Sequence, residues 1–331
     1  MRALLSVQPG DATLLELREV PKPVPAAAEV RIRVSACSLN YPDVLIIEDR
    51  YQFRPDRPFA PGAEIAGIVD AVGPDVTRFA VGDRVIGVGF FGGLAEFTTL
   101  PADRCFSLPD NCSMVDGAAL LMGHGTAHHA LKDRGALQPG ETLLVLGAAG
   151  GVGLAAVELG KIMGARVIAA VSSEEKAAAA RQQGADAVIV YTADMSAKDS
   201  ARAFGADIRA VAVGTVDLVF DPVGGPYAEP ALRSLGWNGR YLVIGFPAGI
   251  PNIPLNLPLL KGCSIVGVFW GAFADRYPDA HRANAAALLE LLSQQRIRPQ
   301  ISGTYRLDDA AAAIAELAAR QTIGKLVITL D

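Results

Sequence analysis

Residues 147–153 read GAAGGVG, a loop with a glycine at every third position. The loop follows the apolar run ETLLVL and precedes the stretch LAAVELGKIMG, whose pattern predicts an amphipathic helix. A lone GxxGxxG is weak evidence, because any tight turn from strand to helix favours glycine. Here a buried strand comes before the loop, a helix comes after it, and further strand and helix units follow. This context predicts a dinucleotide site.

Each glycine of this loop has its own expected role. Gly147 permits the turn, Gly150 lets the backbone approach a pyrophosphate, and Gly153 lets the helix pack on the strand. The backbone N–H groups at the start of the helix then face the negative charge of the phosphates. The alternative is a purely structural turn.

The composition bounds the classes of protein to which the chain can belong. It has 331 residues, of which 51% are hydrophobic, and a formal net charge of -5. The length suits two cores, and the acidic balance gives no basic surface for a nucleic acid. Every long apolar stretch is broken well short of a bilayer span, and the first residues lack the apolar core of a signal peptide. We expect a cytoplasmic protein without nucleic-acid or membrane partners. The scattered cysteines include no CxxC pair, so we expect them to be reduced and mostly buried.

The chain changes character near residue 122. Before it, short β-rich runs separated by Pro and Gly predict a compact, largely antiparallel unit. After it, β-branched runs and helical stretches predict a doubly wound parallel sheet. These runs are TLLVLG, ARVIAAV, DAVIVY, VDLVFD, RYLVIGF and CSIVGVF. After Trp270 a long helical stretch leads to a predicted helix and strand, and we expect this tail to return to the first unit.

The end of the second of these strands bears on the choice of cofactor. NAD-binding sheets usually carry an acid there, about 20 residues after the loop, for the ribose 2′-hydroxyl. Ser172 stands at that place and Lys176 follows in the next helix, a pair that suits the 2′-phosphate of NADPH. Two alternatives stay open. Ser172 and Glu175 also fit a helix capping box, and Glu174 or Glu175 can turn to the ribose.

Several motifs together resemble the medium-chain dehydrogenase/reductase superfamily, and within it the zinc-free quinone oxidoreductase branch. They run in register over nearly the whole chain and are SLNYPDVL, APGAEIAGIVDAVG, VGDRVIG, GTAHHAL, GAAGGVG, FDPVGG and VIGFPAGIPNIPLN. The resemblance implies an α/β protein with two domains. One is a GroES-like, β-rich catalytic domain, residues 1–122 completed by 269–331. The other is a Rossmann domain with a doubly wound parallel sheet, residues 123–268, that binds NADPH.

The resemblance also implies where other members of the superfamily hold a catalytic zinc. Matching their motifs puts Asn40, Ala63 and Met122 at the three ligand positions, and these residues are not a zinc ligand set. The cysteine-rich lobe of such relatives is absent as well. His124 and His128 have a spacing that binds metal on a helix, but no Glu, Asp or Cys accompanies them locally. We therefore expect no metal.

Without a metal, the acceptor of the hydride has to be polarised by hydrogen bonds. Asn40 can donate from its amide and Asp43 can orient neighbouring groups. Tyr51 matches a tyrosine that lies at the substrate pocket in similar quinone reductases. Asn40 and Asp43 can instead be turn residues that bond the local backbone. Tyr51 can be a proton donor or only an aromatic wall.

The resemblance implies further contacts with the cofactor. They are Thr126 beside the nicotinamide, Gly150, Gly151 and Val152 at the pyrophosphate, Ser172, Lys176 and Tyr191 at the adenosine phosphate end, Gly245 and Phe246 after the fifth strand, and Phe269, Trp270 and Arg320. Core packing explains the aromatic residues at 246, 269 and 270 about as well.

These observations favour an NADPH-dependent, metal-free reductase that transfers hydride to quinones or α,β-unsaturated carbonyls. One alternative is an enoyl thioester reductase, but the sequence shows no Lys/Arg cluster for the long basic channel that such an enzyme needs. Another is a catalytically silent NADPH-binding protein, either a sensor or a crystallin-like protein. Similar proteins are commonly dimers through the sheet edge of the cofactor domain, so we expect a homodimer.

Overall fold

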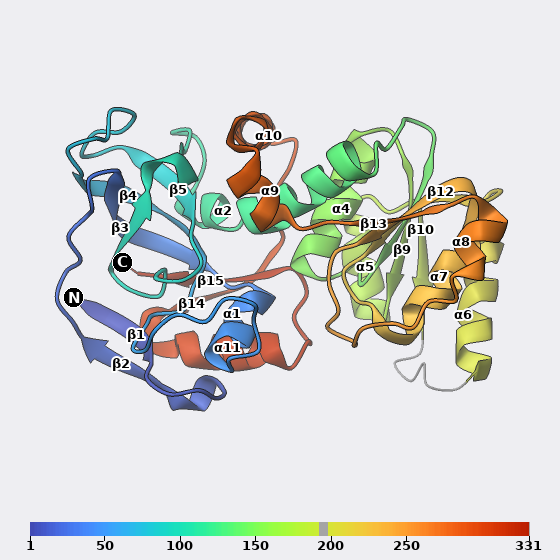
Figure 1. Ribbon diagram of the computed structural model, residues 1–331, viewed down its shortest axis with the longest axis horizontal. Helices are drawn as coiled ribbons and strands as arrows, with labels where there is room; N and C mark the ends of the chain where they lie inside the picture. The colour runs from blue at the N-terminus through green and yellow to red at the C-terminus, as the bar shows by residue number, and fades with distance from the viewer. Residues whose placement is uncertain (192–197, 331) are drawn as a thin grey trace. The chain divides into compact units, whose positions relative to one another are not determined.

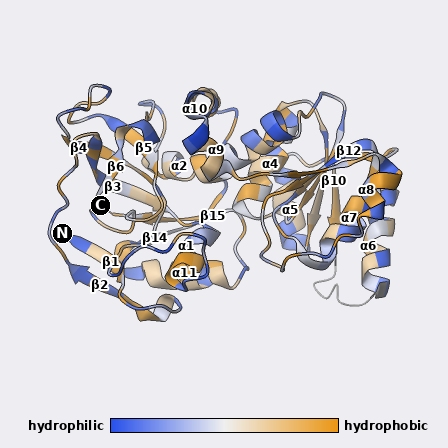
Figure 2. Ribbon diagram, in the orientation of Figure 1, coloured by the Kyte–Doolittle hydropathy of each residue, from blue (hydrophilic) through white to orange (hydrophobic). Residues whose placement is uncertain are grey.

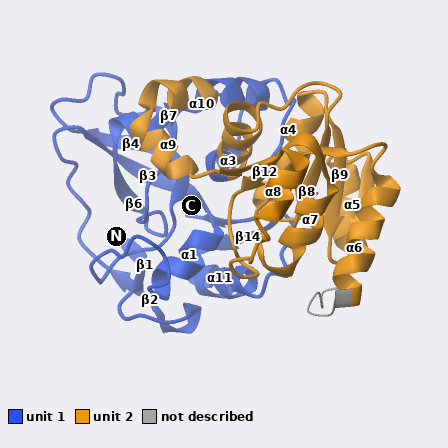
Figure 3. Cartoon of the chain, turned by 45° about the vertical axis from the view of Figure 1, so that its right-hand side comes forward, with its two compact units in different colours: residues 1–122, 285–331 blue, residues 123–284 orange. Residues whose placement is uncertain are grey.

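The computed structural model describes residues 1–191 and 198–330. The chain forms two compact units, unit 1 with residues 1–122 and 285–331 and unit 2 with residues 123–284 (Figure 3). This division differs from the expected one in a single segment, residues 269–284, which pack within unit 2. The ring of Phe273 stacks on His129 at 3.9 Å between centroids, which ties this segment to the beginning of unit 2. The roles of the two units as catalytic and cofactor domains stay predictions.

Among the described residues, unit 2 contains a six-stranded parallel sheet in the order β10-β9-β8-β11-β12-β13. Figure 1 labels β9, β10, β12 and β13 of this sheet. The strands are β8 (Thr142–Leu146), β9 (Arg166–Val171), β10 (Ala187–Val190), β11 (Val216–Asp221), β12 (Leu235–Val243) and β13 (Ser264–Gly267). Their order runs outward from β8 and β11 in opposite directions, so the sheet is doubly wound, as expected. Ligands of such sheets bind beyond the carboxyl ends of the strands where the order reverses, here between β8 and β11.

Helices alternate with these strands. The first is a continuous helical stretch, residues 121–134, in which α3 (Thr126–His128) lies between two π-helical segments. The others are α4 (Gly151–Ile162), α5 (Glu174–Gln182), α6 (Lys198–Val211), α7 (Ala228–Ser234), α8 (Asn256–Lys261), α9 (Trp270–Arg276) and α10 (Pro278–Ser293), which continues into unit 1. All five residues of β8 are buried, as its continuous apolar run predicts for a strand covered on both faces.

Unit 1 is β-rich. A small sheet pairs β1 (Arg2–Ser6) with β2 (Leu15–Glu19), and the main sheet has the order β14-β15-β3-β4-β5-β7, with β6 also paired to β3. The main strands are β3 (Glu29–Ser38), β4 (Glu64–Val72), β5 (Arg84–Val88), β6 (Phe97–Pro101), β7 (Cys105–Ser107), β14 (Ile301–Arg306) and β15 (Lys325–Thr329). The unit also contains α1 (Tyr41–Ile47), α2 (Met114–Ala118), α11 (Ala310–Ala318) and the last part of α10. Because β15 pairs with β3, the tail returns to unit 1 as predicted.

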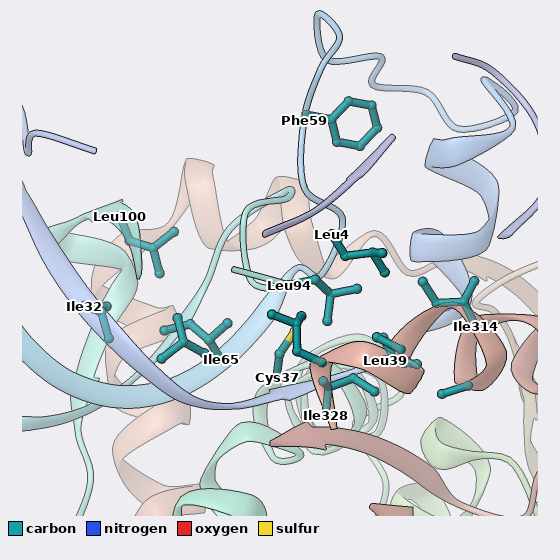
Figure 4. Packing of buried hydrophobic residues seen from close by; sticks show 14 of the residues in the cluster. Leu4, Ile32, Cys37, Leu39, Phe59, Ile65, Leu94, Leu100, Ile314 and Ile328 are labelled. Carbon is teal, nitrogen blue, oxygen red and sulfur yellow. The ribbon is translucent and has the colours of Figure 1, made fainter. Parts of the chain in front are cut away.

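The core of unit 1 lies between its sheet, α1 and α11. Figure 4 shows Ile32, Ile65 and Ile328 of the sheet in one cluster with Ile314 of α11 and with Leu39, which follows β3. Val44, Ile46 and Ile47 of α1 belong to the same cluster. Cys37 lies in the same cluster, and all four cysteines of the chain are free and buried, which confirms that expectation.

The pairing of three strands in unit 1 places three polar side chains together. Ser38 at the end of β3 pairs with Glu64 at the start of β4 and, on its other side, with Val327 of β15. Asn40 follows β3 directly, and Lys325 begins β15. Residues 40, 64 and 325 therefore meet at one edge of the unit although they lie far apart in the sequence.

Candidate functional site

The glycine loop lies at the carboxyl end of β8, where the strand order reverses. Gly147 has a φ of 55°, so its turn favours glycine. A Cβ atom at Gly153 would lie 2.3 Å from the carbonyl oxygen of Gly147, so packing of the helix on the strand requires glycine there. Both roles match the expectations for these residues.

Gly150 differs from its two neighbours in the motif. It is exposed, and a Cβ atom there would meet only the carbonyl oxygen of Gly147, at an ordinary contact distance of 3.6 Å. Packing within the chain therefore gives no reason for glycine at this position. It precedes α4 directly, so a group from outside the chain can approach the first N–H groups of this helix, those of Gly151 and Val152 included.

The end of β9 brings Ser172 and Lys176 together. The Lys176 ammonium donates to the Ser172 hydroxyl oxygen at 3.2 Å. The cap of α5 is the neighbouring Ser173, which accepts from the backbone N–H of Lys176 at 3.3 Å. The alternative in which Ser172 caps the helix is therefore wrong, because the cap is the next residue, Ser173, and α5 begins at Glu174. Glu174 is exposed and lies 3.7 Å from Arg181 in a surface ion pair.

Tyr191 follows β10 and is anchored in the core of unit 2. Its backbone N–H donates to the carbonyl of Val171 at 2.9 Å, which places it beside the end of β9. Its ring lies 4.8 Å from that of Tyr227 and 5.5 Å, edge to face, from that of Phe204. Burial raises the pKa of the Tyr191 phenol. The aromatic ring thus has a packing role besides the contact expected of it.

Thr126 lies on the helical stretch that packs closely against the glycine loop. A Cβ atom at Gly123 would lie 3.3 Å from the carbonyl oxygen of Gly151, so the two helices meet at their glycines. Two residues further along, a Cβ atom at Gly125 would lie 3.0 Å from the ring of Trp270. Trp270 is buried and its ring meets His281 edge to face. Core packing therefore explains Trp270.

The remaining expected cofactor residues divide between the two units. Phe246 and Phe269 are exposed, so core packing does not explain either ring. Gly245 follows β12, and a Cβ atom there would meet nothing nearer than 3.8 Å. Arg320 belongs to unit 1, where its guanidinium donates to the hydroxyl of Tyr41 at 3.0 Å.

In unit 1, Asp43 joins the start of α1 to the loop before β4. Its carboxylate accepts from the backbone N–H of Asn40 at 2.8 Å and from that of Gly62 at 3.0 Å. The side chain is 1% exposed, and this burial raises the pKa of Asp43 to about 6. The local bonding role foreseen for Asp43 is thus present in the structure.

Glu64 and Lys325, which the sequence analysis did not single out, form a buried ion pair around Asn40. The Lys325 ammonium donates to the amide oxygen of Asn40 at 2.5 Å and to Glu64 Oε2 at 3.2 Å. The other oxygen of Glu64 accepts from the backbone N–H of Met122 at 2.8 Å. One feature of the sequence could have pointed to Glu64 and Lys325: each is a charged residue at the first position of an otherwise largely apolar strand, EIAGIVDAV and KLVIT.

This network bears on the expected role of Asn40. Its Nδ2 group donates to the carbonyl of Ser38 and to Glu64 Oε2, each at 3.2 Å. Both amide N–H groups are therefore used within unit 1, and Asn40 has none left for an acceptor while these bonds hold. These bonds favour a supporting role for Asn40, and its role as a donor to the acceptor stays a prediction.

The residues at the three zinc ligand positions do not fit zinc. The ammonium of Lys325 lies against the side-chain oxygen of Asn40 and would repel a divalent cation there. Ala63 offers no side-chain ligand, and Met122 only a thioether. Within residues 1–191 and 198–330, no three His, Cys, Asp or Glu side chains are grouped as metal ligands would be.

The two histidines with metal-binding spacing have other surroundings. His124 pairs through Nε2 with Glu158 at 2.8 Å and is buried. Burial lowers the pKa of His128 to about 4, so its ring is neutral at physiological pH. Glu158 is an acid partner of His124 that the local sequence did not reveal, since it lies on α4.

Tyr51 lies after α1 and is half-buried against the core of unit 1. Burial and the nearby charge of Asp43 both raise the pKa of its phenol. Tyr51 is therefore protonated at neutral pH, as a proton donor must be.

Comparisons with known proteins cover most of the chain. A family model described as an alcohol dehydrogenase GroES-like domain matches residues 26–110, and one described as a zinc-binding dehydrogenase matches residues 151–286. Quinone oxidoreductase-like protein 2 of Bos taurus is 37% identical over 96% of this chain and 89% of its own. The quinone oxidoreductase of Pseudomonas aeruginosa is 36% identical over 96% of each chain.

Solved structures agree in fold. A mycobacterial protein, Rv1454c, complexed with NADPH matches with a TM-score of 0.91 and 32% identity, over 99% of this chain and 100% of its own. The Escherichia coli quinone oxidoreductase complexed with NADPH matches with a TM-score of 0.89 and 25% identity, over 99% and 100%. In the part of this chain that the structure describes, no helix is long and apolar enough to cross a membrane.

Proposed function

Because the chain belongs to the medium-chain dehydrogenase/reductase superfamily and resembles its quinone oxidoreductases, we propose that it transfers hydride to quinones or α,β-unsaturated carbonyls without a metal. It is an oxidoreductase of this superfamily, and its cofactor is NADPH. The observation that carries the proposal is the open Gly150 at the switch point of the sheet, together with the Ser172 and Lys176 pair at the end of the next strand.

The residues of unit 2 suit the parts of NADPH in turn. The N–H groups of Gly151 and Val152 at the start of α4 bind the pyrophosphate, because they face the approach that Gly150 leaves open. Lys176 and Ser172 bind the 2′-phosphate, to which an ammonium and a hydroxyl can both donate. Thr126, Tyr191, Gly245, Phe246, Phe269 and Arg320 remain proposed contacts.

The bound NADPH supplies the hydride, and the chain has to supply a proton and hold the acceptor. Tyr51 is proposed as the group that donates a hydrogen bond, and then the proton, to the acceptor oxygen, because its phenol is half-buried and protonated. Asp43, Asn40, Glu64 and Lys325 hold the loops on either side of it in place. In this account they are positioning residues and touch no substrate.

The oligomeric state is proposed from one surface. β13 is the last strand in the sheet order of unit 2, and the segment before it carries exposed Leu255, Leu259 and Leu260. Figure 2 shows α8 largely in the hydrophobic colour. An edge strand beside exposed leucines suits pairing with a second copy of the chain, so we propose a homodimer. We also propose that the protein is located in the cytoplasm.

A direct assay tests the proposed activity. Purified protein should consume NADPH when given 1,2-naphthoquinone or methyl vinyl ketone, and little when given crotonyl-coenzyme A. Tyr51→Phe should lower kcat by about a hundredfold with unchanged NADPH affinity. Turnover of the thioester alone would favour the enoyl thioester reductase. Tight NADPH binding without turnover of any acceptor would favour the silent protein.

A further inference from the structure

We propose that Phe53, Phe90 and Phe91 form a stacking platform that selects polycyclic planar acceptors over small ones. This inference rests on the proposed function and deepens it. The ring of Phe53 lies 4.9 Å from that of Phe90 and 6.0 Å from that of Phe91, and the planes of Phe53 and Phe91 are 14° apart. We refer to these three residues as the aromatic platform.

The platform is exposed although it consists of large apolar side chains. Phe53, Phe90 and Phe91 are 38%, 43% and 38% exposed, so part of each ring faces solvent. They come from two loops, one after α1 and one after β5. Single exposed apolar residues are common on protein surfaces, whereas a cluster of three large ones indicates a binding surface.

Two neighbouring side chains, Phe59 and Arg104, hold rings of the platform in place. The buried ring of Phe59 meets Phe91 edge to face at 5.7 Å, and the guanidinium of Arg104 lies 4.8 Å from the centre of the Phe90 ring. Rings fixed before binding lose little conformational freedom when a ligand stacks on them. The platform is therefore preorganised to receive a flat molecule.

The platform is continuous with the proposed acceptor site of unit 1. The loop that carries Phe90 and Phe91 is bonded to the loop before β4: Gly89 donates to Ala63 at 2.8 Å and Gly93 to Gly62 at 2.8 Å. Gly62 in turn donates to Asp43. Phe53 lies two residues after Tyr51. The same loops thus carry the platform and the residues proposed to position and protonate the acceptor.

The size of the platform favours a planar small molecule as its occupant. Three neighbouring rings offer much less surface than a stable protein interface buries. Aromatic rings prefer offset or tilted stacking at the separations seen here. A fused ring system can contact more than one of the three rings, whereas a small enone contacts one at most. The platform therefore distinguishes acceptors by their aromatic area.

The test compares two acceptors in the variants Phe53→Leu, Phe90→Leu and Phe91→Leu, which keep an apolar side chain and remove the ring. For 9,10-phenanthrenequinone, we expect KM to rise about tenfold, as the loss of one stacking contact predicts, with kcat little changed. For methyl vinyl ketone, KM should stay the same. Tyr277→Leu, an exposed aromatic residue of unit 2, is the matched control and should alter neither acceptor.

A second measurement separates this proposal from the proposed function. Equilibrium dialysis measures binding of 9,10-phenanthrenequinone to the protein without turnover. If the wild type oxidises no NADPH but binds the quinone, and the platform variants lose that binding, the function fails and the platform stands. If the wild type is active and the variants leave the KM values for both acceptors unchanged, or raise them equally, the platform is wrong. Binding that all variants retain also contradicts it.

Discussion

Lys325 connects two segments of unit 1 that lie far from it in the sequence. Its ammonium is buried and bonds both Asn40 and Glu64, which lie 285 and 261 positions away in the sequence. Such distant partners cannot be found from local patterns, because strand pairing alone brings them together. Ser172 and Lys176 were predictable for the opposite reason, since both lie within a few residues of the end of β9 in the sequence.

Removing the lysine should leave a buried charge without its partner. We expect Lys325→Met to lower the free energy of unfolding by about 3 to 5 kcal/mol in urea titrations, because Glu64 then stays buried and unpaired. The double variant Glu64→Gln and Lys325→Met should lose less than the sum of the two single losses. The exposed pair of Arg233 and Glu229 is the control, where Arg233→Met should cost less than about 1 kcal/mol. An equally small loss at Lys325 would show that the buried pair does not stabilise the fold.

Asp43 should make stability depend on pH in a defined window. Burial raises its folded pKa to about 6 from 3.8, so between these values the folded state holds a proton that the unfolded state releases. The stability of the wild type relative to Asp43→Asn should therefore fall as pH rises from about 4 to about 6, and level off above. Urea unfolding of both proteins across this range measures the difference. A difference that is flat, or that rises with pH, would contradict a raised pKa.

At the scale of elements, the parallel strands of unit 2 were predictable because their apolar runs are continuous and separated by helices or long connections. The π-helical turns in residues 121–134 and the strand β14 were not foreseen. The strand β14 depends on pairing with β15, which no local pattern reveals. The glycine loop could be predicted from the sequence because the roles of its glycines depend on the turn from β8 to α4, which is local in the sequence.

Two glycines of this loop, Gly150 and Gly153, should separate the effect on stability from the effect on cofactor binding. Gly150→Val should keep the unfolding free energy and weaken NADPH and NADH binding together, at least tenfold, because the side chain enters only the open approach to the pyrophosphate. Gly153→Ala should instead lose about 1 to 3 kcal/mol, because its Cβ atom meets the backbone of Gly147. Unfolding and fluorescence titrations measure the two effects. A Gly150→Val protein that binds both cofactors normally would remove the pyrophosphate from this loop.

At the scale of the whole molecule, the two-unit organisation could be predicted because short β-rich runs give way to alternating strands and helices near residue 122. The structure divides the chain at the same place. The second crossing lies inside α10, at residues 284–285, later than expected. A continuous helix carries no linker signal at that point. Contacts such as the bond from Asn284 to Asp133 decide which unit the preceding segment joins, and the sequence does not reveal them.

The proposed dimer makes one prediction at this scale. Leu259→Glu places a charge on the exposed surface of α8, so it should convert a dimer into monomers in sedimentation experiments with the fold intact. Val213→Glu, at an equally exposed position after α6, should leave the mass unchanged. A wild type that sediments as a monomer, or a Leu259→Glu protein that remains dimeric, would reject this surface as the interface.

We propose that the chain reduces its acceptor with NADPH and without a metal, because Asn40, Ala63 and Met122, at the positions that the resemblance assigns to zinc ligands, do not fit zinc. The most direct test is the initial rate of NADPH oxidation with 1,2-naphthoquinone before and after treatment with a strong chelator, with the zinc content determined on the same samples. The account predicts an unchanged rate and no stoichiometric zinc. Stoichiometric zinc, with activity that is lost on its removal and restored on its return, would contradict it.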